Sequence, residues 1–278
     1  MELENKVVGF QGTIGSFSEE ALIRYFGEYQ KRQEYPEFED VFIALREGKI
    51  AYGVLPIENS STGAISATYD LLKQYDCYIV GETYCSIKHH LIGFSGTKLS
   101  EIKEVYSHIQ GLEQCSNFLN RFSNWKLIPF HNTAVSAKLV KESQSKVKAA
   151  IASERAAKVY NLTILEKNIH NQENNTTRFV IVGRHLERNT FSNKFSAVLS
   201  LENRAGFLYE LLGAFAKNNV NLVKIESRPL KEHAFQYCLY LDFEGDLQGE
   251  NVKRALETIE KGGYDFRLLG SYVKEVQL

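Results

Sequence analysis

The sequence predicts an α/β protein built from two α/β lobes followed by a smaller βαββαβ unit of the ferredoxin-like type. Strands alternate with helices in two successive blocks, which is typical of parallel βα units on open sheets. A polar stretch then interrupts the pattern, and the order beyond it is strand, helix, strand, strand, helix, strand. We therefore expect a first domain at 1–184, with lobes of roughly 1–80 plus 165–184 and 81–164, a linker at 185–193 and a second domain at 194–278.

Each predicted element follows from local chemistry. Apolar runs predict strands, while Gly12 and Gly15 suit a turn after the first of them. Ser16 or Ser18 can cap the helix that follows, and Gly27 ends it. The predicted strands of the first domain are 6–10, 50–57, 78–80, 87–94, 104–107, 126–130, 149–152 and 179–182, and its helices after the first are 40–46, 111–122, 133–142 and 153–161. The predicted elements of the second domain are strand 195–201, helix 206–217, strands 221–227 and 234–243, helix 251–260 and strand 264–275.

Composition and charge exclude several classes of function. The 33 basic and 34 acidic residues give a net charge of −1, which argues against nucleic acid or an anionic membrane as the main partner. We find no apolar run long enough to span a bilayer and no signal peptide. The four cysteines form no CxxC pair, so we expect reduced thiols and a cytoplasmic protein. Adjacent His89 and His90 point to opposite faces of a strand, so we expect no metal and no cofactor.

Polar side chains gather where predicted strands end, as ligand-binding groups do in open α/β sheets. The stretch GVLPIENSSTGAI presents Glu58, Asn59, Ser60 and Thr62 after a buried strand. A single helix cap does not require so many polar residues, so we favour a functional site there.

The second lobe repeats this arrangement in VYSHIQGLEQC, where Ser107 and His108 precede a helix. Gln110 and Gln114 share one face of that helix. Thr133 follows a third strand, and helix capping is the simpler interpretation of it. The glycine-rich turn near the N-terminus suits an anion site or a structural turn equally well.

The stretch NNTTRFVIV places a hydroxyl and a guanidinium, Thr177 and Arg178, at the mouth of the strand that begins at Phe179. Hydroxyls, amides and one arginine facing a cleft suit a small, anionic, multiply polar organic molecule. The sequence carries no Ser-His-Asp signature and no nucleotide-binding loop.

Taken in order, these motifs resemble the prephenate dehydratase family over nearly the whole chain. The matching stretches are GxxGxxS, PIENSxxG, SHxQxxxQC, NxTRF and, in the C-terminal unit, ESRP. The C-terminal unit is similar to an ACT domain, a regulatory module that binds small molecules. The chain departs from the family at Asn171, usually Asp, at Ile109, usually Pro, and at Phe207, usually Ala.

The resemblance implies a lyase of L-phenylalanine biosynthesis with a two-lobed, periplasmic-binding-protein-like catalytic domain. It would convert prephenate to phenylpyruvate. The chain starts at the first strand, so we expect no chorismate mutase segment. The catalytic residues that the resemblance implies are Thr177 at the leaving hydroxyl, Arg178 at a substrate carboxylate, Asn59, Ser107 and Gln114 as orienting groups, and Glu58 in the cleft. Further expected substrate contacts are Phe179, Ser60, Thr62 and Thr133.

Regulation and assembly are also implied by the resemblance. L-phenylalanine is the expected effector, with a site formed by Gly206, Phe207, Leu208, Glu226, Ser227 and Arg228. Phe207 would either pack on the ligand ring or fill part of its space. The ACT-like unit would also make the protein a homodimer or tetramer. Two alternatives stay open: an arogenate dehydratase, and an amino-acid sensor that has lost catalysis.

Overall fold

In the computed structural model, which describes residues 6–187, 189–200, 204–230, 236–246 and 248–276, the chain divides into two compact units. Unit 1 comprises Met1–Gly63 and Tyr84–Phe179, and unit 2 comprises Ala64–Thr83 and Val180–Leu278. The division falls inside two long strands, β5 (Tyr78–Ser86) and β11 (Thr176–Gly183). The domain boundaries expected from the sequence stay a prediction.

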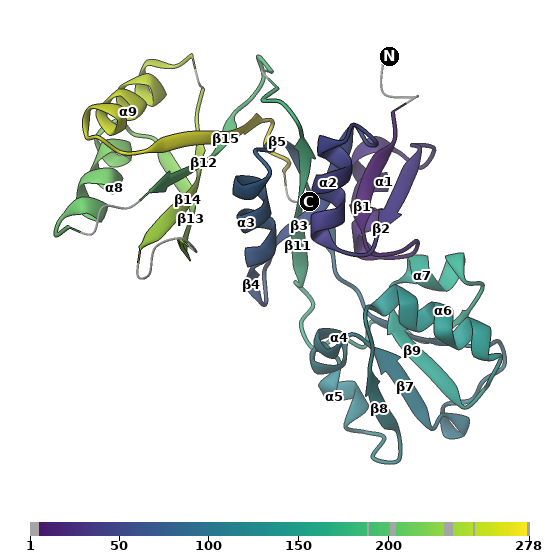
Figure 1. The fold of residues 1–278 in the computed structure, drawn as a ribbon. Helices are drawn as coiled ribbons and strands as arrows, with labels where there is room; N and C mark the ends of the chain where they lie inside the picture. The colour runs from purple at the N-terminus through teal and green to yellow at the C-terminus, as the bar shows by residue number, and fades with distance from the viewer. Residues whose placement is uncertain (1–5, 188, 201–203, 231–235, 247, 277–278) are drawn as a thin grey trace. The chain divides into compact units, whose positions relative to one another are not determined.

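Unit 1 contains two α/β lobes, as the alternation of strands and helices predicted (Figure 1). In the first lobe β1 pairs in parallel with β2 and β3, and the strands lie in the order β11-β3-β1-β2. In the second lobe the order is β10-β6-β9-β7-β8, with β7 parallel to β8 and β9. The first-lobe elements are β1 (Val8–Gln11), α1 (Phe17–Phe26), β2 (Arg32–Tyr35), α2 (Phe38–Arg46), β3 (Tyr52–Asn59) and β4 (Gly63–Ala64). The second-lobe elements are β6 (His90–Gly93), η1 (Leu99–Glu101), β7 (Glu104–Ser107), α4 (Ile109–Gln114), α5 (Ser116–Leu119), β8 (Lys126–Pro129), α6 (Thr133–Ser143), β9 (Lys148–Ala152), α7 (Glu154–Val159) and β10 (Thr163–Glu166).

Helix ends in unit 1 follow side-chain capping. Ser16 caps α1, and its hydroxyl accepts from the N–H of Glu19. Asn132, rather than the predicted Thr133, caps α6, because its Oδ1 accepts from the N–H of Val135 at 2.7 Å. The helix predicted at 111–122 is split into α4 and α5, with Cys115 between them. Ending α4 at Gln114 leaves that side chain at the tip of a short helix.

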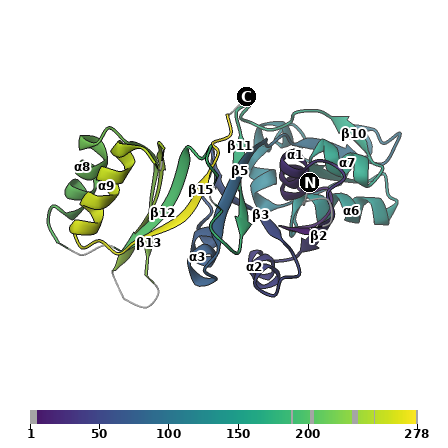
Figure 2. The same ribbon diagram turned by 90° about the horizontal axis from the view of Figure 1, so that it is seen from above.

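Unit 2 has the predicted βαββαβ order. Its strands lie in the order β13-β14-β12-β15-β5, and the pairs β12–β14, β12–β15 and β13–β14 are antiparallel. Helices α8 and α9 lie side by side (Figure 2). The elements are α3 (Ser66–Gln74), β12 (Lys194–Ser200), α8 (Phe207–Lys217), β13 (Asn221–Pro229), β14 (Tyr237–Glu244), α9 (Glu250–Lys261) and β15 (Phe266–Tyr272). Leu201, Ala234 and Phe235, which were predicted to lie in strands, fall outside the described residues.

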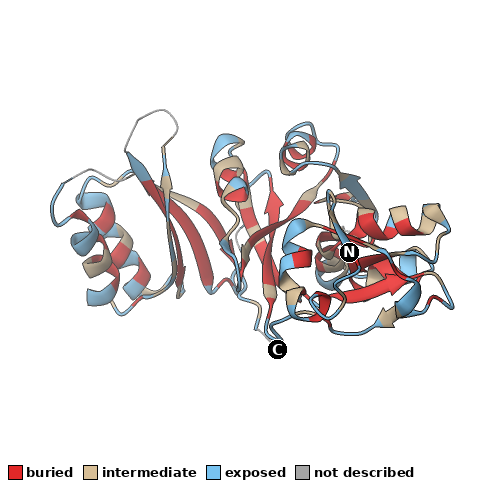
Figure 3. Ribbon diagram, turned by 90° about the horizontal axis from the view of Figure 1, so that it is seen from below, coloured by how far each residue is buried: buried red, intermediate tan, exposed pale blue. Residues whose placement is uncertain are grey.

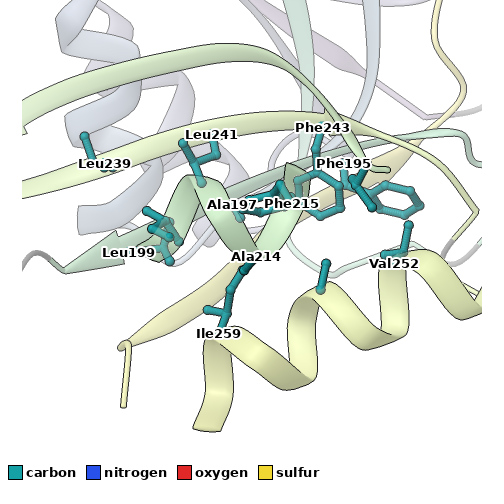
Figure 4. Packing of buried hydrophobic residues seen from close by; sticks show 13 residues of the cluster. Phe195, Ala197, Leu199, Ala214, Phe215, Leu239, Leu241, Phe243, Val252 and Ile259 are labelled. Atoms are coloured by element: carbon teal, nitrogen blue, oxygen red, sulfur yellow. The ribbon is translucent and has the colours of Figure 1, made fainter. Parts of the chain in front are cut away.

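The core of unit 2 forms where the two helices cover one face of the sheet (Figure 4). Phe243 stacks on Phe195 with ring centroids 5.2 Å apart and meets Phe215 at 5.4 Å. Figure 3 shows buried residues along the strands and on the inner sides of α8 and α9, with exposed residues on their outer sides. This is the amphipathic pattern that lets helices pack on a sheet. No helix in the described part of the chain has the length and apolarity needed to cross a bilayer.

Candidate functional site

The candidate site is built around a hydrogen-bonded pair, Asn59 at the end of β3 and Thr177 near the start of β11. Asn59 Nδ2 donates to Thr177 Oγ1 at 2.9 Å and to Asn175 Oδ1 at 2.7 Å. Asn59 is 8% exposed and Thr177 7%, so these bonds form largely out of water. Leaving such a buried polar group unpaired costs about 1–3 kcal/mol, which favours this pairing strongly.

The orientation of the Asn59 amide is fixed by the main chain. Its Oδ1 accepts from the N–H of Ser61 at 2.9 Å and from the N–H of Thr62 at 3.0 Å. A backbone N–H can only donate, so the oxygen must face the turn and the NH2 group must face Thr177. Thr177 Oγ1 therefore accepts from Asn59, and the proton of its own hydroxyl is left for another acceptor. The hydroxyl could donate to a ligand that reaches it, although Thr177 is not among the described residues that line the cavity beside Gln114.

The network extends from the first lobe into the second. Asn175 Nδ2 donates to Gln114 Oε1 at 3.0 Å, and His89 Nε2 lies 3.0 Å from the same oxygen. Gln114 and Asn175 also border a cavity of about 240 Å³. The other residues that line it are Ser61, Thr62, Glu113, His170, Asn171 and Gln172. A cavity lined mostly by amides and hydroxyls, with one carboxyl group and one imidazole, suits a small polar ligand.

Arg178 does not lie beside Thr177 as the sequence suggested. Strand β11 begins at Thr176, not at Phe179, so Thr177 and Arg178 are consecutive strand residues that point to opposite faces. Arg178 is buried, and its Nη1 lies 3.9 Å from Glu58 Oε2 on the neighbouring strand. Glu58 and Arg178 thus form one pair and Asn59 and Thr177 another. A contact between Arg178 and a substrate carboxylate stays a prediction.

Among the other predicted substrate contacts, Thr62 reaches the cavity and its Oγ1 lies 3.3 Å from Asn59 Oδ1. Ser60 holds the turn together, because its hydroxyl donates to Asn174 O at 3.1 Å and accepts from the N–H of Thr176. Phe179 is buried in the strand, and Thr133 is the first residue of α6. Of the four residues, Thr62 borders the cavity. Ser60, Phe179 and Thr133 have structural positions instead.

Ser107 and His108 support the second lobe. Ser107 is fully buried, and its hydroxyl donates to Ile151 O at 2.9 Å, which ties β7 to β9. His108 caps α4, since its Nδ1 accepts from the N–H of Gln110 at 3.3 Å. Both residues position α4, the helix that carries Gln114. A direct substrate contact for Ser107 stays a prediction.

The glycine-rich turn after β1 is a structural turn that binds the protein's own carboxylates. The N–H of Gly15 donates to Glu19 Oε2 at 2.7 Å, and the N–H of Ile14 donates to Glu34 Oε2 at 2.9 Å. Glu19, fully buried, also accepts from Arg155 of the second lobe at 2.7 and 3.0 Å and pairs with Arg32 at 2.8 Å. Burial alone would raise the pKa of the Glu19 carboxyl, but Arg155, the Gly15 N–H and Arg32 together hold it below its ordinary value.

Two members of the network were missed by sequence reasoning, Asn175 and His89. Asn175 lies two residues before Thr177, on the same side of the extended chain, and that spacing was the available signal. For His89 the sequence offers no signal beyond its position next to His90. In the described residues no group of three or more His, Cys, Asp or Glu side chains could hold a metal ion.

The predicted effector residues all lie in unit 2. Gly206 precedes α8 as its N-cap residue with a φ of 85°, a conformation that favours glycine, and Leu208 in the first turn is exposed. Phe207 is buried within the unit, where its ring meets Tyr264 edge-on at 4.6 Å. On β13, Glu226 Oε2 lies 3.9 Å from Lys224 Nζ, Ser227 is exposed, and Arg228 Nη2 pairs with Asp70 Oδ2 of α3 at 3.1 Å.

Comparisons with known proteins agree with this organisation. A family model for prephenate dehydratase matches residues 8–187, and a model for the ACT domain matches residues 196–261. A prephenate dehydratase from Methanocaldococcus jannaschii is 37% identical and covers 96% of this chain and 98% of its own length. An arogenate dehydratase/prephenate dehydratase from Arabidopsis thaliana chloroplasts is also 37% identical and covers 95% of this chain and 71% of its own.

Solved structures resemble the chain over almost its full length. A prephenate dehydratase from Arthrobacter aurescens, solved in complex with L-Phe, superimposes with a TM-score of 0.87 at 29% identity, covering 96% of this chain and 90% of its own. A quorum-quenching acylase superimposes with a TM-score of 0.88 at 26% identity, covering 97% and 98%. The predicted fold class, two α/β lobes with a βαββαβ unit, is confirmed.

The carboxylate of Glu19 should stabilise unit 1 in a pH-dependent way. Glu19→Gln leaves Arg155 without its buried partner, so we expect a loss of about 3 kcal/mol at pH 7. The folded-state pKa lies below the unfolded value of 4.5, so this contribution is present above pH 4.5 and disappears as pH falls through the folded-state pKa. Thermal melts from pH 7 to pH 3 measure it.

The matched control is Glu20→Gln, one residue further along α1. Burial raises the pKa of Glu20, so removing its charge should leave the melting temperature unchanged or raise it at pH 7. Equal melting temperatures for Glu19→Gln and the unaltered protein at pH 7 would show that the buried pair contributes no stability.

Proposed function

Because the chain belongs to the prephenate dehydratase family, we propose that its lyase reaction, the conversion of prephenate to phenylpyruvate, takes place at the site formed by Asn59, Thr177 and Gln114. The observation that carries this assignment is the Thr177 hydroxyl, whose oxygen accepts from Asn59 and whose proton is left for a ligand. The same fold occurs in an acylase, so fold alone does not assign the reaction.

The conversion of prephenate to phenylpyruvate requires no covalent bond between the substrate and the protein. The bond between the ring carbon and the hydroxyl breaks, and the leaving oxygen takes up a proton and departs as water. The bond to the ring carboxylate breaks as well; its electron pair enters the ring, and carbon dioxide leaves. Because the ring becomes aromatic, the reaction is strongly downhill. Because a carbon–oxygen bond is broken by elimination, the reaction is that of a carbon–oxygen lyase. The site has to hold a dianion and stabilise the leaving oxygen.

Thr177 meets the second of these needs. A threonine hydroxyl has a pKa far above neutrality, so it is a poor outright acid. A positioned hydroxyl can nevertheless donate a hydrogen bond to an oxygen on which negative charge develops, and such preorganised donors are among the largest contributions to catalysis. We assign the delivered proton to water in the cavity and the hydrogen bond to Thr177.

Carboxylate binding falls to groups that line the cavity. Gln114 contributes an amide, and Ser61 and Thr62 contribute hydroxyls. A substrate carboxylate would have to replace Glu58 as the partner of Arg178, which lies 3.9 Å from it. A bidentate Arg–carboxylate contact would then form on the face of β11 opposite Thr177. We regard Asn59, Thr177 and Gln114 as the better supported set.

The nearest rival is an arogenate dehydratase, whose substrate carries an amine in place of the keto group. The A. thaliana relative has both activities in its name. Asn59 and Thr177 contact the ring hydroxyl in our assignment, and this contact does not discriminate between the two side chains. Assaying both substrates decides this point. A sensor without catalysis is disfavoured, because Thr177 and its donor are both present.

We further propose that L-phenylalanine regulates the enzyme through the ACT domain. The structure of the A. aurescens relative is described as a complex with L-Phe. The N–H groups at the start of α8, after Gly206, can receive an amino-acid carboxylate. Phe207 is buried and packs on Tyr264 inside the unit, while Leu208 is exposed. We also propose that two ACT domains pair through an exposed sheet edge, which makes the protein a homo-oligomer. The four cysteines are free and buried, which fits a reducing, cytoplasmic location.

Thr177→Ala should lower turnover of prephenate by about two or more orders of magnitude, the scale of a lost preorganised donor. Thr177→Ser keeps the hydroxyl and should retain more activity. The measurement is the rate of phenylpyruvate formation, with melting temperature as the check on folding. Near-normal turnover in a folded Thr177→Ala protein would move the leaving-group contact to another residue.

Millimolar L-phenylalanine should lower the rate of phenylpyruvate formation and raise the melting temperature, because a ligand that binds the native state stabilises it by mass action. D-phenylalanine is the control and should do neither. If L-phenylalanine changes neither quantity, the effector assignment is wrong. Equal effects of the two enantiomers would show that no stereospecific amino-acid site exists.

A further inference from the structure

We propose that His89, as a neutral imidazole protonated on Nε2, is a positioning residue that holds the Gln114 amide in the orientation needed to bind substrate. The proposal rests on the site assigned above and adds a residue to it. His89 lies directly before β6. Its ring is the last group of the hydrogen-bond series that runs from Thr177 through Asn59, Asn175 and Gln114.

The polarity of that series can be followed group by group. Asn175 Oδ1 accepts from Asn59, so the Asn175 NH2 group must be the part that faces Gln114. That contact makes the facing atom of Gln114 an acceptor, its Oε1. His89 Nε2 lies 3.0 Å from the same oxygen and must therefore donate to it. The tautomer of His89 is thus set, through three amides, by the main chain after β3.

The surroundings of His89 keep it neutral. His89 is 3% exposed, its ring centroid lies 5.6 Å from that of Phe17 with the two rings nearly perpendicular, and its Nδ1 is buried without a hydrogen-bond partner in the described residues. A protonated ring would place a second N–H at that position with nothing to receive it. Burial lowers the pKa of His89 to about 4; the Gln114 bond opposes this shift, and the neighbouring His170 and His90 add to it.

The His89 donor fixes the orientation of the Gln114 amide. Its Oε1 accepts from both Asn175 and His89, which uses both lone pairs of the oxygen. The NH2 group then lies on the other side of the amide, and Gln114 borders the 240 Å³ cavity. Both N–H groups are available to a substrate carboxylate. Without the His89 donor only Asn175 opposes rotation of the amide.

Kinetics separate this role from a structural one. His89→Phe keeps a ring against Phe17 but removes the donor, so we expect KM for prephenate to rise about tenfold, the equivalent of about one hydrogen bond, with kcat changed less than threefold. His89→Gln places an amide N–H near the position of Nε2 and should restore KM to within threefold. His90→Phe, an adjacent buried histidine that accepts from the N–H of Asn168, is the matched control and should leave KM unchanged.

A KM within twofold of normal in His89→Phe would overturn the proposal, as would equal losses in His89→Phe and His89→Gln. Nitrogen-15 NMR of the imidazoles in the unaltered protein gives a second test that needs no variant. We expect a neutral ring protonated on Nε2 from pH 8 to pH 5.5. The Nδ1–H tautomer, or protonation within that range, would contradict it. An unaltered protein with no activity on prephenate would refute the proposed function instead, while the NMR result would still decide the tautomer.

Discussion

Two backbone N–H groups, those of Ser61 and Thr62, determine the polarity of the whole candidate site. They hold Asn59 Oδ1 at 2.9 and 3.0 Å, and the orientation of every amide beyond it follows. A reversed Asn59 amide would lose both bonds and set its NH2 group against two donors. At about 1 kcal/mol for each bond, plus about 1–3 kcal/mol for a buried group left unpaired, the reversed form is a minor species. The rigid turn after β3 therefore specifies where the Thr177 proton can go.

Much of the fold could be predicted from the sequence because its signals are local. Apolar runs marked β1, β3, β7 and β9, and capping residues marked α1. Strand β2 was missed because Arg32–Tyr35 is polar and owes its extended form to pairing with β1. The start of β11 was missed for a related reason: Thr177 and Arg178 break the apolar run. Their partners lie on β3, more than a hundred residues earlier, and only tertiary pairing makes a strand of them.

The residues of the site were predictable in part, and the limit was again sequence distance. The order of the motifs indicated Asn59, Gln114 and Thr177, and the structure joins Asn59 directly to Thr177 and, through Asn175, to Gln114. The sequence motifs could not reveal that Ser107 donates to a main-chain carbonyl of the neighbouring strand, since that bond depends on the β7–β9 register. In unit 2 the sequence left open whether Phe207 fills the effector space. Its packing on Tyr264 depends on where β15 begins, which no local pattern shows.

The central claim is that Asn59 directs the Thr177 proton to the substrate, and Asn59→Asp tests it most directly. The substitution keeps the acceptor for Ser61 and Thr62 but replaces the donor to Thr177 with a second carboxylate oxygen, which would draw the hydroxyl proton to itself. With folding verified by melting temperature, the account predicts a fall in kcat on prephenate of about two orders of magnitude or more. A folded Asn59→Asp protein with kcat within threefold of normal would contradict it.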